Sequence, residues 1–324
     1  MSRSSRIALA AAFAAVLSVA HAATEPSVPT VGKRIGPFTV DTLAEGVHLF
    51  RPADGGSGRP NSLVVERSDG VLVVDGQSSP AGAKELLEAI ARLTTKPVKY
   101  LVFTHPHADA AGGASAFPKD VLVVASDGCR TAMADSGFDF GAEAREREGE
   151  SWKEPERRLP TAVTSTEFRL EDPKHTVQVL PIQALPAHSA GDTLVWLRKE
   201  GIVAIGDLIA PARGLWGNGA NLGNWIGVLN SIVSEKPKIV VPLHGAPTDA
   251  QELRLTRDAL SWVRGSVQQA FMDRVPTGII PEKILASEDL VRYFDASVPR
   301  PILRGLFEQS VREALEWRQK HGFD

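Results

Sequence analysis

The sequence is poor in cysteine and has no excess of basic charge. Its 324 residues include one cysteine, Cys129, so neither an intrachain disulfide nor a cysteine-rich zinc site is available. The formal net charge is −3 at pH 7, which argues against broad, charge-driven binding to nucleic acid. We therefore expect a small-molecule substrate and no nucleic-acid partner. Any bound metal must use histidine and carboxylate ligands.

The first residues have the layout of a targeting segment. Arg3 and Arg6 give a basic start, residues 7–20 are uncharged and rich in alanine, and Ala20-His21-Ala22 is an A-x-A pattern. This layout predicts a cleaved secretory signal over residues 1–22, and hence a periplasmic or secreted protein. An uncleaved anchor is the alternative, but the apolar run is shorter than the roughly 20 residues that span a bilayer. After cleavage we expect no membrane span.

The remaining chain has enough apolar residues, 43% of the sequence, to bury a sizeable core. We expect an extended lead-in over residues 23–37, one domain over 38–250, and helices over 251–324 packed on it. Strand patterns recur in two groups with helical patterns after each, which predicts two sheets with helices outside. The mixed-charge segment 139–158 predicts a solvated surface helix, with a lid near the site as the alternative.

Metal-competent side chains follow an apolar strand predicted over residues 98–103. The sequence there continues Thr104-His105-Pro106-His107-Ala108-Asp109. Pro106 favours extended backbone at His105, and in extended chain positions i and i+2 project to the same side. His105 and His107 are thus expected to point into one cavity, with Asp109 beside them.

Three further residues stand where other predicted strands begin or end. His188 lies in a loop leading into an apolar run, Asp207 follows Ile205-Gly206, and His244 follows Val241-Pro242-Leu243. Each taken alone is more often structural. Together they indicate a ring of ligands around one edge of the sheets.

This set of residues resembles the metallo-β-lactamase superfamily of hydrolases, from about Asn61 to His244. The resemblance implies an α/β (α+β) fold, a four-layer αββα sandwich, here with a C-terminal helical extension. Within the superfamily the chain looks most like a periplasmic group linked to sulfur oxidation and quinoprotein relay systems. The opening at Asn61, the segment before Tyr100 and the stretch from Gly206 to Trp225 support this likeness.

The resemblance also implies a ligand set. It assigns His105, His107 and His188 to one zinc ion and Asp109, Asp207 and His244 to a second, and it gives Asp75 a supporting role, for which a plain turn role is the alternative. The chain departs from the family at Ala110, where many binuclear members have a histidine. One or two zinc ions are therefore expected, and the carboxylates also suit iron or manganese.

These ligands predict hydrolysis in which a metal-bound hydroxide, oriented by Asp109 as the catalytic residue, attacks a carbonyl. The substrate would be an ester, thioester, lactone or amide. Three alternatives stay open: a β-lactamase acting on β-lactam antibiotics, a mononuclear iron oxygenase of sulfur compounds, and a non-catalytic metal-binding protein. Arg213 and Trp216, in a glycine-rich loop after Asp207, are candidate pocket residues.

Overall fold

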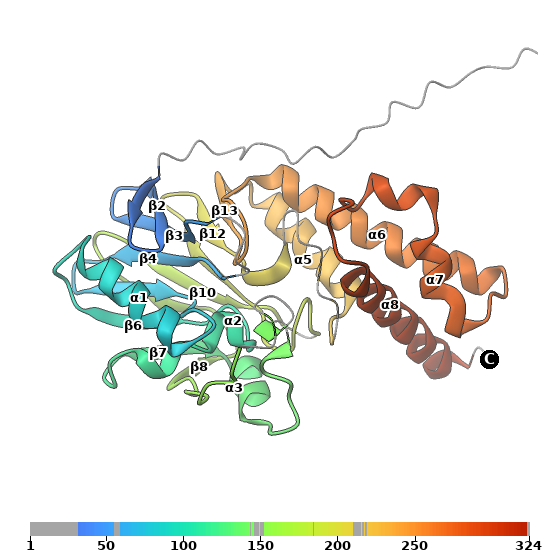
Figure 1. Cartoon of the computed structure of the whole chain (residues 1–324), viewed down its shortest axis with the longest axis horizontal. Helices are drawn as coiled ribbons and strands as arrows, with labels where there is room; N and C mark the ends of the chain where they lie inside the picture. Colours follow the sequence, from blue (N-terminus) through green and yellow to red (C-terminus); the bar gives the residue numbers. More distant parts are fainter. Residues whose placement is uncertain are drawn as a thin grey trace, which may run out of the picture.

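Two β-sheets packed face to face form the centre of the computed structural model (Figure 1). The structure describes residues 32–54, 59–142, 144–145, 149, 152–183, 185–209, 215, 217 and 219–322. The predicted signal segment 1–22 lies outside them. Helices cover the outer faces of both sheets and extend beyond the second one, so the predicted mixed α/β sandwich with C-terminal helices is confirmed.

The larger sheet has eight strands in sequence order. They are β1 (Lys33–Ile35), β2 (Phe38–Ala44), β3 (Val47–Pro52), β4 (Ser62–Glu66), β5 (Val71–Val74), β6 (Val98–Val102), β7 (Leu122–Ser126) and β8 (Ala162–Thr164). Strands β1 to β5 are antiparallel, and β5 to β8 are parallel. The sheet begins at Lys33 rather than at the predicted boundary, Phe38, because Lys33–Ile35 pairs with Phe38–Val40 across a turn where Gly36 has φ of 60°.

The smaller sheet has the order β13-β12-β11-β10-β9. Its strands are β9 (Phe168–Leu170), β10 (Val177–Pro181), β11 (Thr193–Leu197), β12 (Ile202–Ala204) and β13 (Ile239–Val241). Only the β12–β13 pair is parallel among these strands.

The helices are α1 (Pro80–Ala91), α2 (Ala108–Ala111), α3 (Asp127–Ala134), α5 (Leu222–Ser234), α6 (Ala250–Met272), α7 (Ile280–Leu285) and α8 (Arg300–His321). Short 3₁₀ turns are η1 (Ala114–Ala116), η2 (Gly206–Leu208), η3 (Thr277–Ile279) and η4 (Glu288–Arg292). Within the described part of the chain, no helix is long and apolar enough to cross a membrane.

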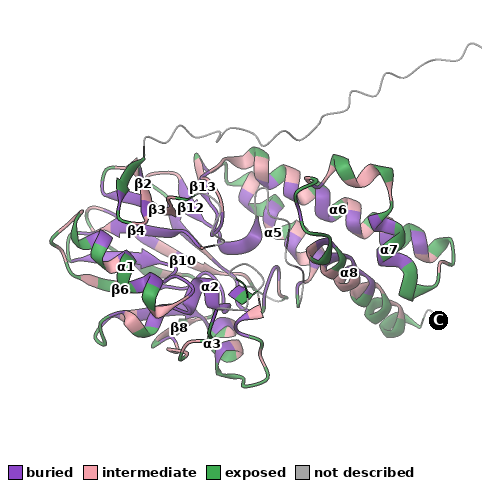
Figure 2. Ribbon diagram, viewed as in Figure 1, coloured by how far each residue is buried: buried purple, intermediate pink, exposed green. Residues whose placement is uncertain are grey.

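Successive side chains along each strand point to opposite faces of its sheet, and the buried ones form three separate layers of core. In β4, Leu63 and Val65 face the other sheet, whereas Val64 faces the layer that contains Leu86 of α1. The third layer lies between the smaller sheet and α5 to α8, around the fully buried Trp225. Figure 2 shows the resulting buried centre of both sheets. Cys129 is buried in the outer layer of the larger sheet.

The segment 139–158 differs from the predicted solvated helix. Phe140, Ala144 and Trp152 are buried against the larger sheet's outer layer. The Nε1 of Trp152 donates to the carbonyl of Ser78 at 3.3 Å, just before α1. The charge-rich sequence therefore carries apolar anchors, which composition alone did not reveal.

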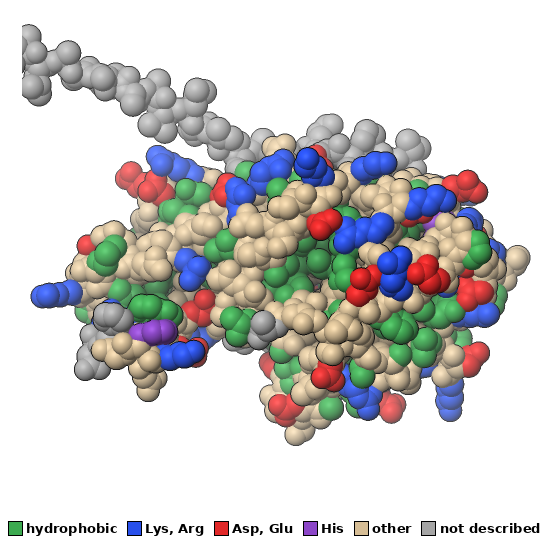
Figure 3. All heavy atoms as spheres, turned by 180° about the vertical axis from the view of Figure 1, so that it is seen from behind, with side chains coloured by type: hydrophobic (Ala, Val, Ile, Leu, Met, Phe, Trp, Pro, Cys, Tyr) green, Lys and Arg blue, Asp and Glu red, His purple; other side chains and the backbone are tan. Residues whose placement is uncertain are grey.

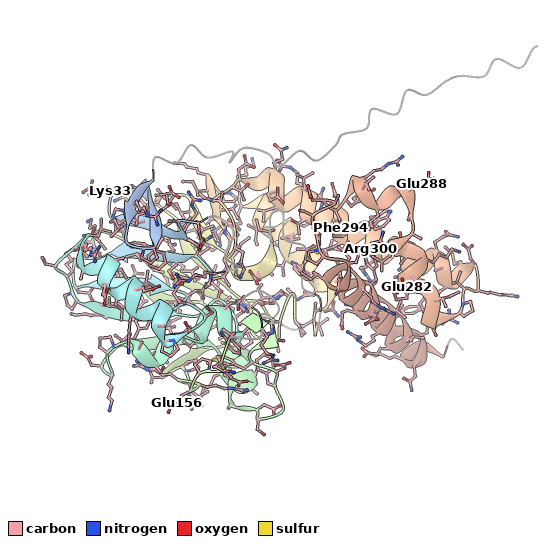
Figure 4. All side chains as sticks on the ribbon, viewed as in Figure 1. Lys33, Glu156, Glu282, Glu288, Phe294 and Arg300 are labelled. Atoms are coloured by element: carbon pink, nitrogen blue, oxygen red, sulfur yellow. The ribbon has the colours of Figure 1, made fainter. Side chains whose placement is uncertain are left out.

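The C-terminal helices pack on the smaller sheet through α5. Leu253 and Leu260 of α6 and Leu306 of α8 join the same core, whereas Leu315 of α8 is 41% exposed. Phe294 (labelled in Figure 4) packs edge-on against Phe307 near the start of α8. Gln309 of α8 also donates from Nε2 to the carbonyl of Ala220, just before α5, at 2.6 Å.

Candidate metal centre

All six predicted metal ligands lie at one edge of the two sheets. His105, His107 and Asp109 follow β6, and His188 lies in the β10–β11 loop. Asp207 is in η2 after β12, and His244 follows β13. Each is at most 5% exposed: His105, His107, Asp109, His188, Asp207 and His244. The carboxyl ends of the parallel pairs β5–β6 and β12–β13 thus bring residues distant in sequence together.

Three imidazoles form a nearly equilateral triangle. The ring centroids of His105, His107 and His188 are 5.1 Å apart in every pair, with interplanar angles of 77°, 79° and 81°. One ring nitrogen from each lies within 4.8 Å of the others. Zinc takes imidazole nitrogens at about 2.0–2.1 Å in a tetrahedral arrangement. The buried nitrogen set therefore fits a zinc ion that keeps one position open.

The carboxylates converge beside this triangle. Asp109 Oδ1 lies 3.2 Å from His105 Nε2, and Asp109 Oδ2 lies 3.0 Å from His244 Nε2. Asp207 Oδ2 is 3.8 Å from the same His244 nitrogen. His105, Asp109 and Asp207 form a second group able to hold a metal. Ala110 is fully buried in α2 next to Asp109, so a methyl group occupies the position of the family's additional histidine.

The pKa shifts follow from burial and from this charge pattern. Burial lowers the pKa of His107 to about 3, and the neighbouring His105 and His188 act in the same direction. Burial also lowers the pKa of His105, but the hydrogen bond and charge of Asp109 outweigh it and raise the value to about 9. For Asp109, burial raises the pKa, yet His105 and His244 hold it well below its usual range. Without a metal, the site therefore presents an ionised Asp109, a neutral His107 and a protonated His105, which releases its proton when a metal binds.

A buried chain of hydrogen bonds orients the imidazole of His105 through its Nδ1 atom. The Thr104 hydroxyl donates to Asp75, at 3.0 and 2.9 Å from its two oxygens, and the Thr104 backbone N–H donates at 2.8 Å. His105 Nδ1 lies 3.1 Å from the same hydroxyl, leaving Nε2 directed toward Asp109. Burial raises the pKa of Asp75 to about 7. This chain gives Asp75 the kind of outer contact that orients metal-binding histidines.

His188 and His107 also have supports that the sequence analysis missed. Asp192 lies 3.4 Å from His188 Nδ1 and accepts from the Ser189 backbone N–H at 2.7 Å. Its position four residues after His188 was the available signal. Trp225 packs edge-on against His188 and donates from Nε1 to a backbone carbonyl of η2 at 2.9 Å. Phe138 stacks on His107, and no sequence pattern pointed to it.

The two predicted pocket residues, Arg213 and Trp216, lie outside the described residues. Gly206, just before Asp207, has φ of 57° and approaches Thr104 so closely that a Cβ there would lie 2.6 Å from the hydroxyl oxygen. Glycine at this position lets the end of β12 reach the motif after β6.

Comparison with known proteins agrees with this geometry. The model of the metallo-beta-lactamase superfamily matches residues 55–244. The linear primary-alkylsulfatase of Pseudomonas sp. (strain ATCC 19151) is 22% identical over 78% of this chain and 54% of its own length. The metallo-beta-lactamase type 2 of Bacillus sp. (strain 170) is 26% identical over 76% of this chain and 92% of its own.

Solved structures show the same fold. The stereoselective inverting sec-alkylsulfatase from Pseudomonas sp. gives a TM-score of 0.67 at 15% identity, covering 85% of this chain and 50% of that one. A metallo-beta-lactamase from Pontibacter korlensis gives 0.54 at 23% identity, covering 69% and 99%. The chain spans about half the length of the alkylsulfatases it matches. It belongs to the metallo-beta-lactamase superfamily, and it gathers His and Asp side chains that are placed to hold a metal ion.

Proposed function

We propose that the protein is a zinc-dependent hydrolase of carboxylic esters or of the related thioesters, lactones or amides. The observation that carries this proposal is the triangle of three buried imidazoles with Asp109 at its side. A donor set of three histidines leaves zinc one open position. When bound, zinc lowers the pKa of water in that position toward neutrality and polarises a carbonyl oxygen.

The residues of the chain supply the rest of the chemistry. Asp109 is ionised at neutral pH, so its carboxylate can orient the attacking water and take up its proton. Asp207 and His244 face Asp109 and are suited to hold a second ion, which would stabilise charge that develops on the substrate. The chain from Asp75 through Thr104 keeps His105 in the orientation that a zinc ligand needs.

Hydrolysis of alkyl sulfate esters is a second candidate. Residues 1–244 make up about three quarters of the chain, so the 85% covered by the sec-alkylsulfatase structure must include part of the C-terminal helices. The metallo-beta-lactamase from Pontibacter korlensis covers only 69%. The likeness to the alkylsulfatase thus extends beyond His244 into the C-terminal helical region, which supports testing sulfate esters beside carboxylic ones.

Metal analysis and a substrate panel test the proposal together. We expect zinc to co-purify with the protein, and turnover of at least one ester, thioester, lactone, β-lactam or alkyl sulfate to be lost on chelation and in His107→Ala. His48→Ala is the matched control, because His48 is buried outside this site, and it should keep both zinc and turnover. One tightly held iron without hydrolysis would favour the sulfur oxygenase. Metal without any turnover would favour a non-catalytic role, and absence of metal would refute every metal-dependent reading.

We also propose a small-molecule substrate, no nucleic-acid partner and a periplasmic or secreted location. The location rests on residues 1–22, and the relation to the periplasmic sulfur-oxidation group stays a prediction. Figure 3 shows Lys and Arg side chains interspersed with Asp and Glu on the face seen from behind. This mixture supports the expectation that no broad basic surface binds nucleic acid.

A further inference from the structure

An aromatic ring stands beside the metal centre. The ring of Phe138 is stacked on the imidazole of His107, with centroids 5.5 Å apart and an interplanar angle of 8°. His107 is buried, whereas Phe138 keeps part of its surface exposed. Phe138 is thus an apolar side chain with remaining exposed surface in direct contact with a candidate metal ligand.

We propose that Phe138 selects the substrate by packing against an apolar alkyl or aryl group next to the scissile bond. This inference rests on the proposed hydrolase function and narrows its substrate class. The β10–β11 loop adds apolar surface, since Leu185, three residues before His188, is 54% exposed. Single exposed apolar residues are common on proteins, so the stacking contact of Phe138 with His107 is the observation that carries this inference.

The backbone around Phe138 is held in place, so the ring forms a pre-set wall. The guanidinium of Arg157 donates to the carbonyls of Asp135 and Phe138, both at 3.0 Å, and lies 4.9 Å from the ring centroid of Phe140. Phe140 is fully buried, and its carbonyl accepts from the backbone N–H of Ala108 at 2.8 Å. The same short segment is therefore tied to Arg157 on one side and to the ligand motif on the other.

Because the segment that carries Phe138 is already held in place, binding a longer apolar substituent costs no free energy for ordering that segment. A polar wall would instead need a hydrogen-bonding partner on the substrate. Phe138 acts on the substrate directly, whereas Arg157 is a positioning residue that acts through Phe138.

Equilibrium binding separates this inference from catalysis. Hexanoate and acetate share a carboxylate that can meet zinc, and they differ only in apolar chain. In calorimetric titrations of the zinc-loaded protein we expect hexanoate to bind at least tenfold more tightly than acetate. Phe138→Ala should reduce that ratio below threefold while acetate affinity and zinc content stay unchanged. Phe138→Leu should keep the preference, and Phe271→Ala, a partly exposed phenylalanine on α6, is the control.

Arg157→Ala tests the positioning role and should lower the hexanoate preference with unchanged acetate affinity. A preference that survives in Phe138→Ala would overturn the proposal. If Phe138→Ala loses zinc, the titrations are made with the bulky polar variant Phe138→Gln instead. Tighter binding of hexanoate than of acetate that is retained in Phe138→Gln would also overturn the proposal. Hexanoate preference in a protein that hydrolyses no ester, thioester, lactone or amide would refute the proposed function alone. Ester hydrolysis with equal binding of both acids would refute this inference alone.

Discussion

Replacing Gly206 with alanine tests how the end of β12 meets the ligand motif. Gly206 has φ of 57°, and an added Cβ would lie 2.6 Å from the Thr104 hydroxyl oxygen and 2.9 Å from its Cβ. Thr104 is not free to move, because its hydroxyl is bonded to Asp75 and lies beside His105 Nδ1. The left-handed conformation costs a non-glycine residue about 1–2 kcal/mol, and overpacking costs about 1–3 kcal/mol more. We expect Gly206→Ala to lower the free energy of unfolding by about 2–5 kcal/mol.

Gly36→Ala is the matched control, because Gly36 has φ of 60° and nothing within 4 Å of the added Cβ. It should lose only the conformational part, about 1–2 kcal/mol. Urea unfolding of both variants measures the difference, and zinc competition should show roughly 10–100-fold weaker binding in Gly206→Ala alone, since Asp207 and His105 must shift. Equal losses of stability in the two variants, with unchanged zinc affinity, would refute the reasoning.

Three further predictions concern the same site. Thr104→Val removes the hydroxyl that donates to buried Asp75, so the free energy of unfolding should fall by about 1–3 kcal/mol. Zinc binding should also weaken in competition titrations. Unchanged zinc affinity would show that the hydroxyl does not orient His105. Since burial raises the pKa of Asp75 to about 7, native metal-free protein holds a proton there that the unfolded chain releases above about pH 4. The stabilisation that this proton provides is complete below pH 4 and is lost as pH rises through 7. The difference in unfolding free energy between wild type and Asp75→Asn should therefore vary over pH 4–7 and be flat above pH 8. A difference that is constant with pH contradicts this. Zinc titration of the metal-free protein should show two steps, with His107→Ala losing the tighter and His244→Ala the weaker; a single step in wild type contradicts two sites.

The ligand residues were predictable because their signals are local. An apolar strand, Pro106 and the two-residue spacing predict a shared direction for His105 and His107 from the chain alone. Their positions at strand ends also indicated that Asp207 and His244 lie at the same edge. Their assignment to a second ion required the family resemblance, since sheet order is a tertiary property. Ligand roles stay predictions, although the structure gathers all six side chains.

The apolar wall was not predictable in the same way. Phe138 meets His107 across 31 positions of sequence, and the segment that follows it looks solvated because its charges outnumber its apolar anchors. Arg157 illustrates the difficulty: within a charge run it looks like a surface cation, yet in the structure its guanidinium binds backbone carbonyls and covers Phe140. A charged residue that makes tertiary hydrogen bonds produces no periodic pattern in the sequence.

The distribution of hydrogen bonds predicts that metal binding stabilises the contact between the two sheets. Between the sheets the core is apolar, but at the site edge polar bonds join the two halves. Thr193 donates from its backbone to the Thr104 carbonyl at 2.7 Å. Asn61 donates through Nδ2 to the carbonyls of Pro242 and Gly245, at 3.0 and 2.8 Å, on either side of His244. These bonds lie at the edge where candidate ligands from both sheets meet. A bound ion therefore stabilises the closed sandwich by its binding free energy, and its removal should loosen this edge before the apolar core between the sheets.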